Sequence, residues 1–149
     1  MSMPGVTSVS AASAATATPL VAGDEVLSVL PGTLPVAELA RRLAGHRAVQ
    51  RVRYPGLEPD PVAVDYVDAF GPLLSFDVAD ADAATRVERA LELIENATSL
   101  GGVASTLEAR ARWEPTRVPP GLLRLSVGLE DADDLWADLA QALDHALSA

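Results

Sequence analysis

Three stretches of the sequence carry an apolar residue at every third or fourth position, the spacing that places side chains on one face of an α-helix. The stripes are Val36, Leu39, Ala40 and Leu43; Ala84, Val87, Leu91 and Ile94; and Leu135, Leu139, Leu143 and Ala146. Pro35 suits a first helical turn, and Gly45 suits the position after a helix end. Asp80 or Asp82 can cap the second helix, and the acidic residues at 130–134 favour the start of the third. Each predicted helix therefore has one apolar face that needs an apolar surface against it.

Short segments that read as β-strands supply that surface. They are VQRVRYPG, LLSFDV, a stretch at about Asn96–Leu100, and LLRLSVG. In LLSFDV, apolar Leu74, Phe76 and Val78 alternate with polar residues, and in LLRLSVG the side chains of Leu123, Leu125 and Val127 point to one face. The segments Leu57–Gly71 and Ser105–Pro120 are predicted to connect these elements.

The order helix, strand, strand, helix, strand, strand, helix predicts an α/β fold of the α+β two-layer type, a sheet of about four strands with three helices on one face. The opposite face would carry Ser75, Asp77, Arg124 and Ser126, and would meet water or another protein. Residues 1–32 are predicted to be a flexible tail and linker rich in Ser, Ala and Thr, and residues 33–149 to form one domain.

Composition disfavours several classes of function. The chain has 11 basic residues, all arginine, and 21 acidic residues. The resulting net charge of −10 argues against nucleic acid or an anionic membrane as partner. The chain has no cysteine, and its two histidines, His46 and His145, are far apart, so we expect no metal site. No apolar run approaches the ~18 residues of a membrane-spanning helix. The first 20 residues lack the features of a secretory signal, so a cytoplasmic location is the default expectation.

Four motifs, in order, carry a resemblance to a known family: YPGL, GPLLSFDV, SLGGV and GLLRLSVGLEDADDLWADLAQAL. Over about Leu34–Leu147 the chain resembles the C-terminal domain of the Cys/Met-metabolism, or trans-sulfuration, family of pyridoxal-phosphate enzymes. That family includes cystathionine γ-synthases, cystathionine lyases and methionine γ-lyases. The resemblance implies the small C-terminal domain of the aspartate-aminotransferase-type fold, also called fold type I.

The resemblance also implies a binding site. In the family, the arginine of the RLSVG strand holds the substrate α-carboxylate and the serine of SLGG lies beside it, which here names Arg124 and Ser99. A guanidinium offers paired N–H donors that match the two oxygens of a carboxylate. Two alternatives stay open for Arg124, a solvated position on the sheet or an ion pair with Asp77, and Ser99 can simply end a strand. Gly101 and Gly102 are expected to form a backbone turn.

The sequence also departs from the family. The family's cofactor lysine and phosphate site belong to a domain that has no counterpart in this sequence, and the chain contains no lysine at all. Ala104 replaces a glutamate, and the connection at 105–121 is short. We therefore expect no catalytic, cofactor-binding or metal-binding residue in this chain alone.

Two functions follow as hypotheses. The chain docks on a separate subunit that carries pyridoxal phosphate and completes a lyase or synthase, or it is a degenerate binding or scaffold module without a role in amino-acid chemistry. A gene fragment without function is a third possibility. A free-standing hydrolase is disfavoured, because no Ser-His-Asp set emerges from the spacing.

Overall fold

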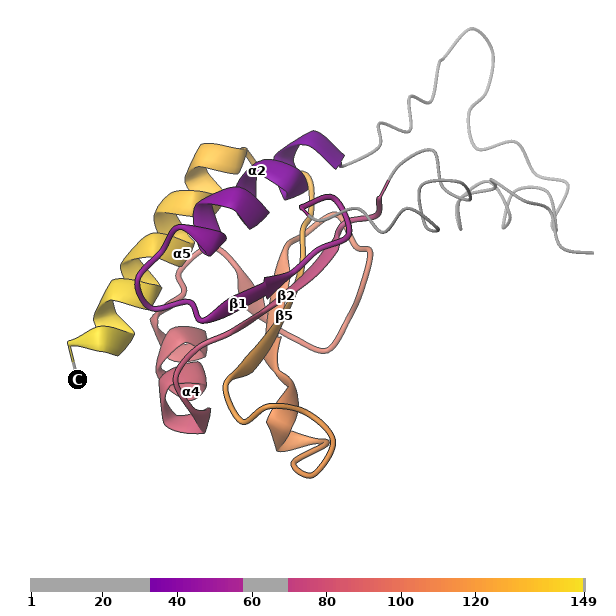
Figure 1. Ribbon diagram of the computed structural model, residues 1–149. Helices are drawn as coiled ribbons and strands as arrows, with labels where there is room; N and C mark the ends of the chain where they lie inside the picture. Colours follow the sequence, from indigo (N-terminus) through magenta and orange to yellow (C-terminus); the bar gives the residue numbers. More distant parts are fainter. Residues whose placement is uncertain (1–32, 58–69, 149) are drawn as a thin grey trace, which may run out of the picture. The chain divides into compact units, whose positions relative to one another are not determined.

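The structure, a computed structural model, describes residues 33–57 and 70–148 (Figure 1). The described helices are α2 (Thr33–Ala44), α4 (Ala81–Ala90) and α5 (Ala132–Leu147), with a short 3₁₀ turn, η1 (Arg110–Arg112). The strands are β1 (Arg51–Arg53), β2 (Leu73–Asp77), β3 (Glu95–Asn96), β4 (Thr106–Ala109) and β5 (Leu122–Ser126). The predicted tail at 1–32 and most of the predicted loop at 57–71 lie outside the described residues.

The described strands form one sheet in the order β1-β2-β5-β4-β3. All pairs are antiparallel except β3 with β4, which is parallel. The helices α2, α4 and α5 lie together against the sheet, and α5 contacts both of the others (Figure 1). This is the predicted two-layer α/β arrangement, and the sequence-based fold class is confirmed.

The core lies between the helices and the sheet, where the predicted stripes meet the apolar strand residues. Leu39, Leu43, Leu139 and Leu143 are fully buried, as are Phe76, Leu123 and Leu125 on the strands. The alternation in β2 and β5 therefore predicted the helix-facing side correctly. Trp136 lies at the margin of this core and makes an edge-to-face contact with the ring of His46, with centroids 6.0 Å apart.

The second helix is shorter than its stripe predicted. Asp80 caps its start, accepting from the backbone N–H of Ala83, but the helix ends at Ala90, so Leu91 and Ile94 lie beyond it. The physical reason is Asp138 of α5, whose carboxylate accepts hydrogen bonds from the backbone N–H groups at 92–94 over 2.8 to 3.0 Å. These bonds hold the chain in a turn, and Ile94 still reaches the core from it.

The sheet has five strands rather than four, because β4 lies inside the segment predicted to be a connection. Its side chains alternate between the faces: Leu107 and Ala109 join the core, while Thr106 and Glu108 lie on the opposite face. All four are buried, so burial alone does not separate the two faces. None of the described helices is long and apolar enough to span a membrane.

Candidate functional site

The sheet face away from the helices carries a row of polar side chains on neighbouring strands. Arg124 of β5 stands directly opposite Ser75 of β2 on one side and Glu108 of β4 on the other. Directly opposite residues in antiparallel strands project to the same face. The backbone register therefore brings Arg124 and Glu108 together.

Arg124 is anchored through one atom of its guanidinium. Its Nη2 donates to Oε2 of Glu108 over 2.8 Å and to the backbone carbonyl oxygen of Thr98 over 3.0 Å. The side chain is 24% exposed, so the guanidinium lies at the surface without being freely solvated. The alternative of an ion pair with Asp77 is therefore wrong, and the arginine is only partly solvated because Glu108 and Thr98 hold it.

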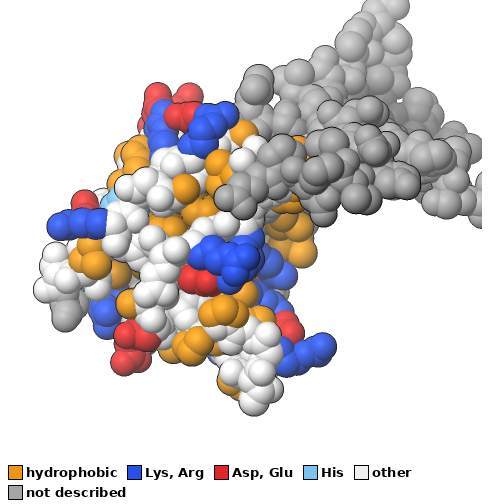
Figure 2. All heavy atoms as spheres, viewed as in Figure 1, with side chains coloured by type: hydrophobic (Ala, Val, Ile, Leu, Met, Phe, Trp, Pro, Cys, Tyr) orange, Lys and Arg blue, Asp and Glu red, His pale blue; other side chains and the backbone are white. Residues whose placement is uncertain are grey.

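Asp77 is occupied by a different arginine. Arg53 of β1 donates to both of its carboxylate oxygens, over 2.8 and 2.6 Å. The hydrogen bond with Asp77 raises the pKa of Arg53 although desolvation opposes this. Figure 2 shows basic side chains gathered over the middle of β1 and β2, with acidic atoms beside them. Instead of being open to water, the polar face is partly covered by ion pairs.

Glu108 is the centre of a second and larger group of polar contacts. Besides Arg124, its Oε2 accepts from Nη1 of Arg110 over 2.8 Å, and its Oε1 accepts from Nε1 of Trp113 over 2.6 Å. The side chain is only 2% exposed, so these donors offset the cost of burying the carboxylate. Hydrogen bonds raise the pKa of Arg110, and the bond with Glu108 contributes more than the bond with Glu114.

Sequence reasoning missed Glu108 because the strand that carries it was missed. The alternation of Thr106 and Glu108 with Leu107 and Ala109 is the signal that could have found it. The family resemblance did not point to it either, since the four motifs skip this segment.

Ser99 directly follows the residue that Arg124 contacts, and its proposed place beside a substrate carboxylate stays a prediction. Its neighbour Thr98 supplies the carbonyl that Arg124 contacts, and the Ser99 carbonyl itself accepts from Thr106 Oγ1 over 2.9 Å. The backbone N–H of Gly101 donates to Ser126 Oγ over 2.9 Å. Gly101 has a φ of 70°, in the left-handed region that favours glycine, which fits the predicted turn. The SLGG segment is thus fixed over the polar face, and the Ser99 residue is exposed there.

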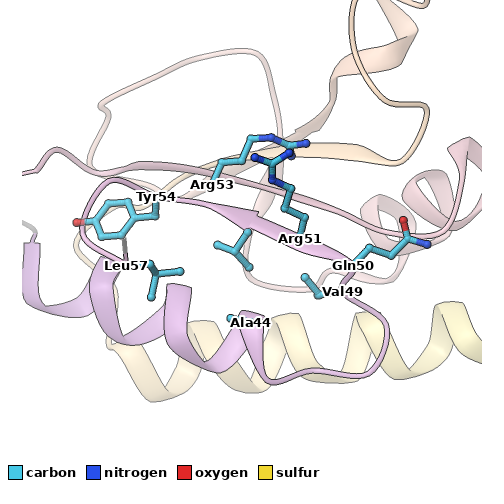
Figure 3. A pocket seen from close by; sticks show the side chains of 8 residues that line it. Ala44, Val49, Gln50, Arg51, Arg53, Tyr54 and Leu57 are labelled. Atoms are coloured by element: carbon cyan, nitrogen blue, oxygen red, sulfur yellow. The ribbon is translucent and has the colours of Figure 1, made fainter. Parts of the chain in front are cut away.

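A pocket of about 430 Å³ lies elsewhere, along the outer strand β1 and the end of α2 (Figure 3). Tyr54 and Leu57 lie on its α2 side, whereas Arg53 extends toward the other side of the strand. Burial raises the pKa of the Tyr54 hydroxyl. Neither Arg124 nor Ser99 lines this pocket or the two smaller ones found in the described part of the chain. These three pockets therefore lie apart from Arg124 and Ser99, and the candidate carboxylate site is defined by the hydrogen bonds of Arg124.

The surface around Ser99 also carries exposed apolar side chains. Leu100, Val103 and Leu129 are 49%, 74% and 79% exposed, and the Leu129 backbone N–H donates to the Val103 carbonyl. Within residues 33–57 and 70–148, no group of three His, Asp or Glu residues is arranged to hold a metal ion. What the arrangement offers is an arginine at an open, partly apolar surface.

Comparisons with known proteins identify the relatives of this domain. A family model described as Cys/Met metabolism PLP-dependent enzyme matches residues 35–144. A "Putative cystathionine gamma-lyase" of Streptomyces coelicolor is 46% identical over 111 residues, covering 72% of this chain and 28% of that protein. The crystal structure of metB from Corynebacterium glutamicum matches with a TM-score of 0.69 and 36% identity, covering 74% of this chain and 31% of that one.

A third similarity is of a different kind. A 42-residue stretch is 88% identical to the cobalamin biosynthesis protein CobIJ of Mycobacterium tuberculosis, covering 28% of this chain and 8% of that protein. The chain spans less than a third of the length of the Cys/Met relatives above. The family match nevertheless takes in every described strand and most of each helix. By these matches, the chain belongs to the Cys/Met metabolism family of PLP-dependent enzymes.

Proposed function

We propose that this chain acts as the C-terminal domain of a pyridoxal-phosphate-dependent sulfur amino-acid enzyme, docking on a separate subunit that binds the cofactor. In this proposal Arg124 contributes to binding the substrate α-carboxylate in trans, and the exposed Ser99 lies beside it. The observation that carries the proposal is the position of Arg124, held at one atom and open to the surface beside the SLGG segment.

The cofactor is assigned to the partner because the residues of this chain do not fit it. Pyridoxal phosphate is held covalently in its enzymes through a lysine amine, and this chain has no lysine. In this proposal the chain supplies no chemical step of its own. Its proposed contribution is to bind and orient a carboxylate.

The shape of the site supports a role that needs a second protein surface. Arg124 lines none of the three pockets described above, and apolar Leu100, Val103 and Leu129 are exposed in this region. Burial of apolar area is the main favourable term in most protein association. A partner that covered these side chains would also shield Arg124 from water. The attraction between Arg124 and a carboxylate is stronger in such a low-dielectric site than in water.

Reconstitution tests this proposal. The cofactor-binding part of the Streptomyces coelicolor relative, truncated before the region that matches this chain, would be purified with and without this chain. We expect stable association and restored lyase or synthase activity only in the mixture. Association without activity, at saturating chain and cofactor, would contradict the proposed role in the enzyme.

A second function, a non-catalytic binding or scaffold module, is favoured by the CobIJ similarity. The family match leaves only residues 1–34 and 145–149, so a 42-residue similarity must overlap the family match in part or in full. This stretch is related to a protein whose name lies outside the Cys/Met family, so the chain carries similarity to two different kinds of protein. A chain of this kind fits a module kept for binding alone. If the chain is such a binding module, Arg124→Ala would leave the activity of any partner enzyme unchanged and alter only the affinity for the partner.

A further inference from the structure

Glu108 is a buried carboxylate that contacts the proposed substrate-binding arginine, and neither the motifs nor the proposed function gives it a role. An outside carboxylate and Glu108 have the same chemistry, so they compete for the same donors. The inference below rests on the proposed function of Arg124, but its test does not need the partner subunit.

The shape of the guanidinium decides how strong this competition is. An arginine offers two pairs of parallel donors, Nε with Nη2 and Nη1 with Nη2, and either pair can hold a carboxylate through two hydrogen bonds. Both pairs include Nη2. In Arg124 the two hydrogens of Nη2 are taken by Glu108 Oε2 and the Thr98 carbonyl oxygen. A carboxylate can therefore be held by two parallel bonds only if one of these acceptors gives way.

Glu108 is the acceptor that can give way at lower cost. It keeps two further donors, Arg110 Nη1 and Trp113 Nε1, when Arg124 turns to another anion. The Thr98 carbonyl belongs to a segment that is fixed on the polar face by the Ser99–Thr106 and Gly101–Ser126 hydrogen bonds. Losing Arg124 would leave that carbonyl without a hydrogen-bond donor from the described residues.

We propose that Glu108 is an internal competitor for Arg124. It occupies Nη2 when no ligand is present, and releases it to an incoming carboxylate while remaining bound to Arg110 and Trp113. In this role Glu108 lowers the affinity of Arg124 for carboxylates in general. A ligand with further contacts on the partner's surface overcomes this competition more readily than a small carboxylate does, so Glu108 contributes to selectivity without touching the reacting atoms.

The test is a titration of the isolated, full chain with sodium acetate, with sodium chloride at matched ionic strength as reference. The probe is the Nε–H signal of Arg124 in an arginine-labelled NMR spectrum, assigned by its loss in Arg124→Lys. We expect Glu108→Gln to bind acetate at least fivefold more tightly than the unchanged chain, because the amide keeps the shape but loses the competing charge. Equal or weaker binding, or no saturable shift in either protein, would overturn the proposal.

Two variants make this result specific. Glu114→Gln is the matched control, because Glu114 pairs with Arg110 and has no contact with Arg124, and its acetate affinity should stay within twofold of the unchanged chain. If Glu108→Gln does not fold, Glu108→Asp shortens the carboxylate by one methylene and is expected to shift affinity in the same direction. A merely structural Glu108 would loosen Arg124 and weaken acetate binding in both variants. Failure of the reconstitution, in contrast, would contradict the proposed function. The acetate titration could still be interpreted, because it uses this chain alone.

Discussion

The two faces of the sheet are built by different rules. The helix-facing side consists of Leu, Phe, Val and Ala side chains supplied at regular intervals by β2, β4, β5 and the three helices. The other side is held by pairs between charged groups far apart in sequence, such as Arg53 with Asp77. The apolar face is specified by local periodicity and stabilised by burial, whereas the polar face is specified by strand register and by donors from loops. Substitutions on the first should change stability, and substitutions on the second should mainly change recognition.

The largest effect is expected for Leu125→Ala on the apolar face. Leu125 is fully buried between the sheet and the helices, and deleting its methyl groups would leave a cavity. The free energy of unfolding should fall by about 2–5 kcal/mol in urea denaturation. Leu129→Ala is the matched control, because Leu129 is 79% exposed, and it should change stability by less than ~0.5 kcal/mol. Similar losses for both variants would mean that burial does not distinguish these positions.

An intermediate effect is expected for Asp138→Asn. Desolvation acts to raise the pKa of this carboxyl, but the backbone hydrogen bonds from residues 92–94 outweigh it, so the net pKa is lowered. Replacing Asp138 by asparagine should lower the free energy of unfolding by about 2 kcal/mol near neutral pH, because the backbone N–H groups at 92–94 lose a charged acceptor. Asp134 is exposed near the start of the same helix, so Asp134→Asn should lower the free energy of unfolding by only about 0.3 kcal/mol.

The pH dependence of the Asp138 effect follows from the direction of its pKa shift. A carboxyl whose folded-state pKa is lowered stabilises the fold above its unfolded value of about 4, and loses that contribution as pH falls through the lower folded value. The stability difference between the unchanged chain and Asp138→Asn should therefore be constant from pH 5 to 7 and shrink in more acidic solution. If the stability difference between the two proteins grew on acidification, the pKa of Asp138 would be raised in the folded state, not lowered.

The smallest effect on stability is expected for Arg124→Ala on the polar face. Its loss leaves Glu108 with two donors, Arg110 and Trp113, so the cost should be about 1 kcal/mol. Thermal unfolding monitored by circular dichroism is sufficient to measure it. A loss as large as that of Leu125→Ala would make Arg124 a structural residue, and the contrast between the two faces would fail.

The same contrast explains which parts of the molecule could be predicted from the sequence. The stripes of Val36 to Leu43 and Leu135 to Ala146, and the alternation around Phe76, predicted the helices, the strands and their core faces, because those signals are local. The end of the second helix and strand β4 could not be read in this way. They depend on Asp138 and on the pairing of Glu108 with Arg124, contacts between residues 16 or more positions apart.

For the candidate site, too, some features followed from the sequence and others depend on contacts between distant residues. The pairing of Arg124 with Ser99 came with the family motifs and stays a prediction, although Arg124 does contact Thr98, the residue before Ser99. The partner of Arg124 was not predicted, since Asp77 and Glu108 both suit an ion pair, and only the strand register and the position of Arg53 decide between them.

The most direct test of the central claim is the kinetics of Arg124→Ala in the reconstituted pair, run beside a binding assay and an Arg89→Ala control on the exposed surface of α4. An arginine that holds the substrate carboxylate through two bonds contributes about 1.5–3 kcal/mol. We predict that KM for the amino acid rises roughly tenfold or more while docking stays intact and Arg89→Ala behaves like the unchanged chain. Unchanged kinetics with intact docking would contradict the account and leave this chain a binding module.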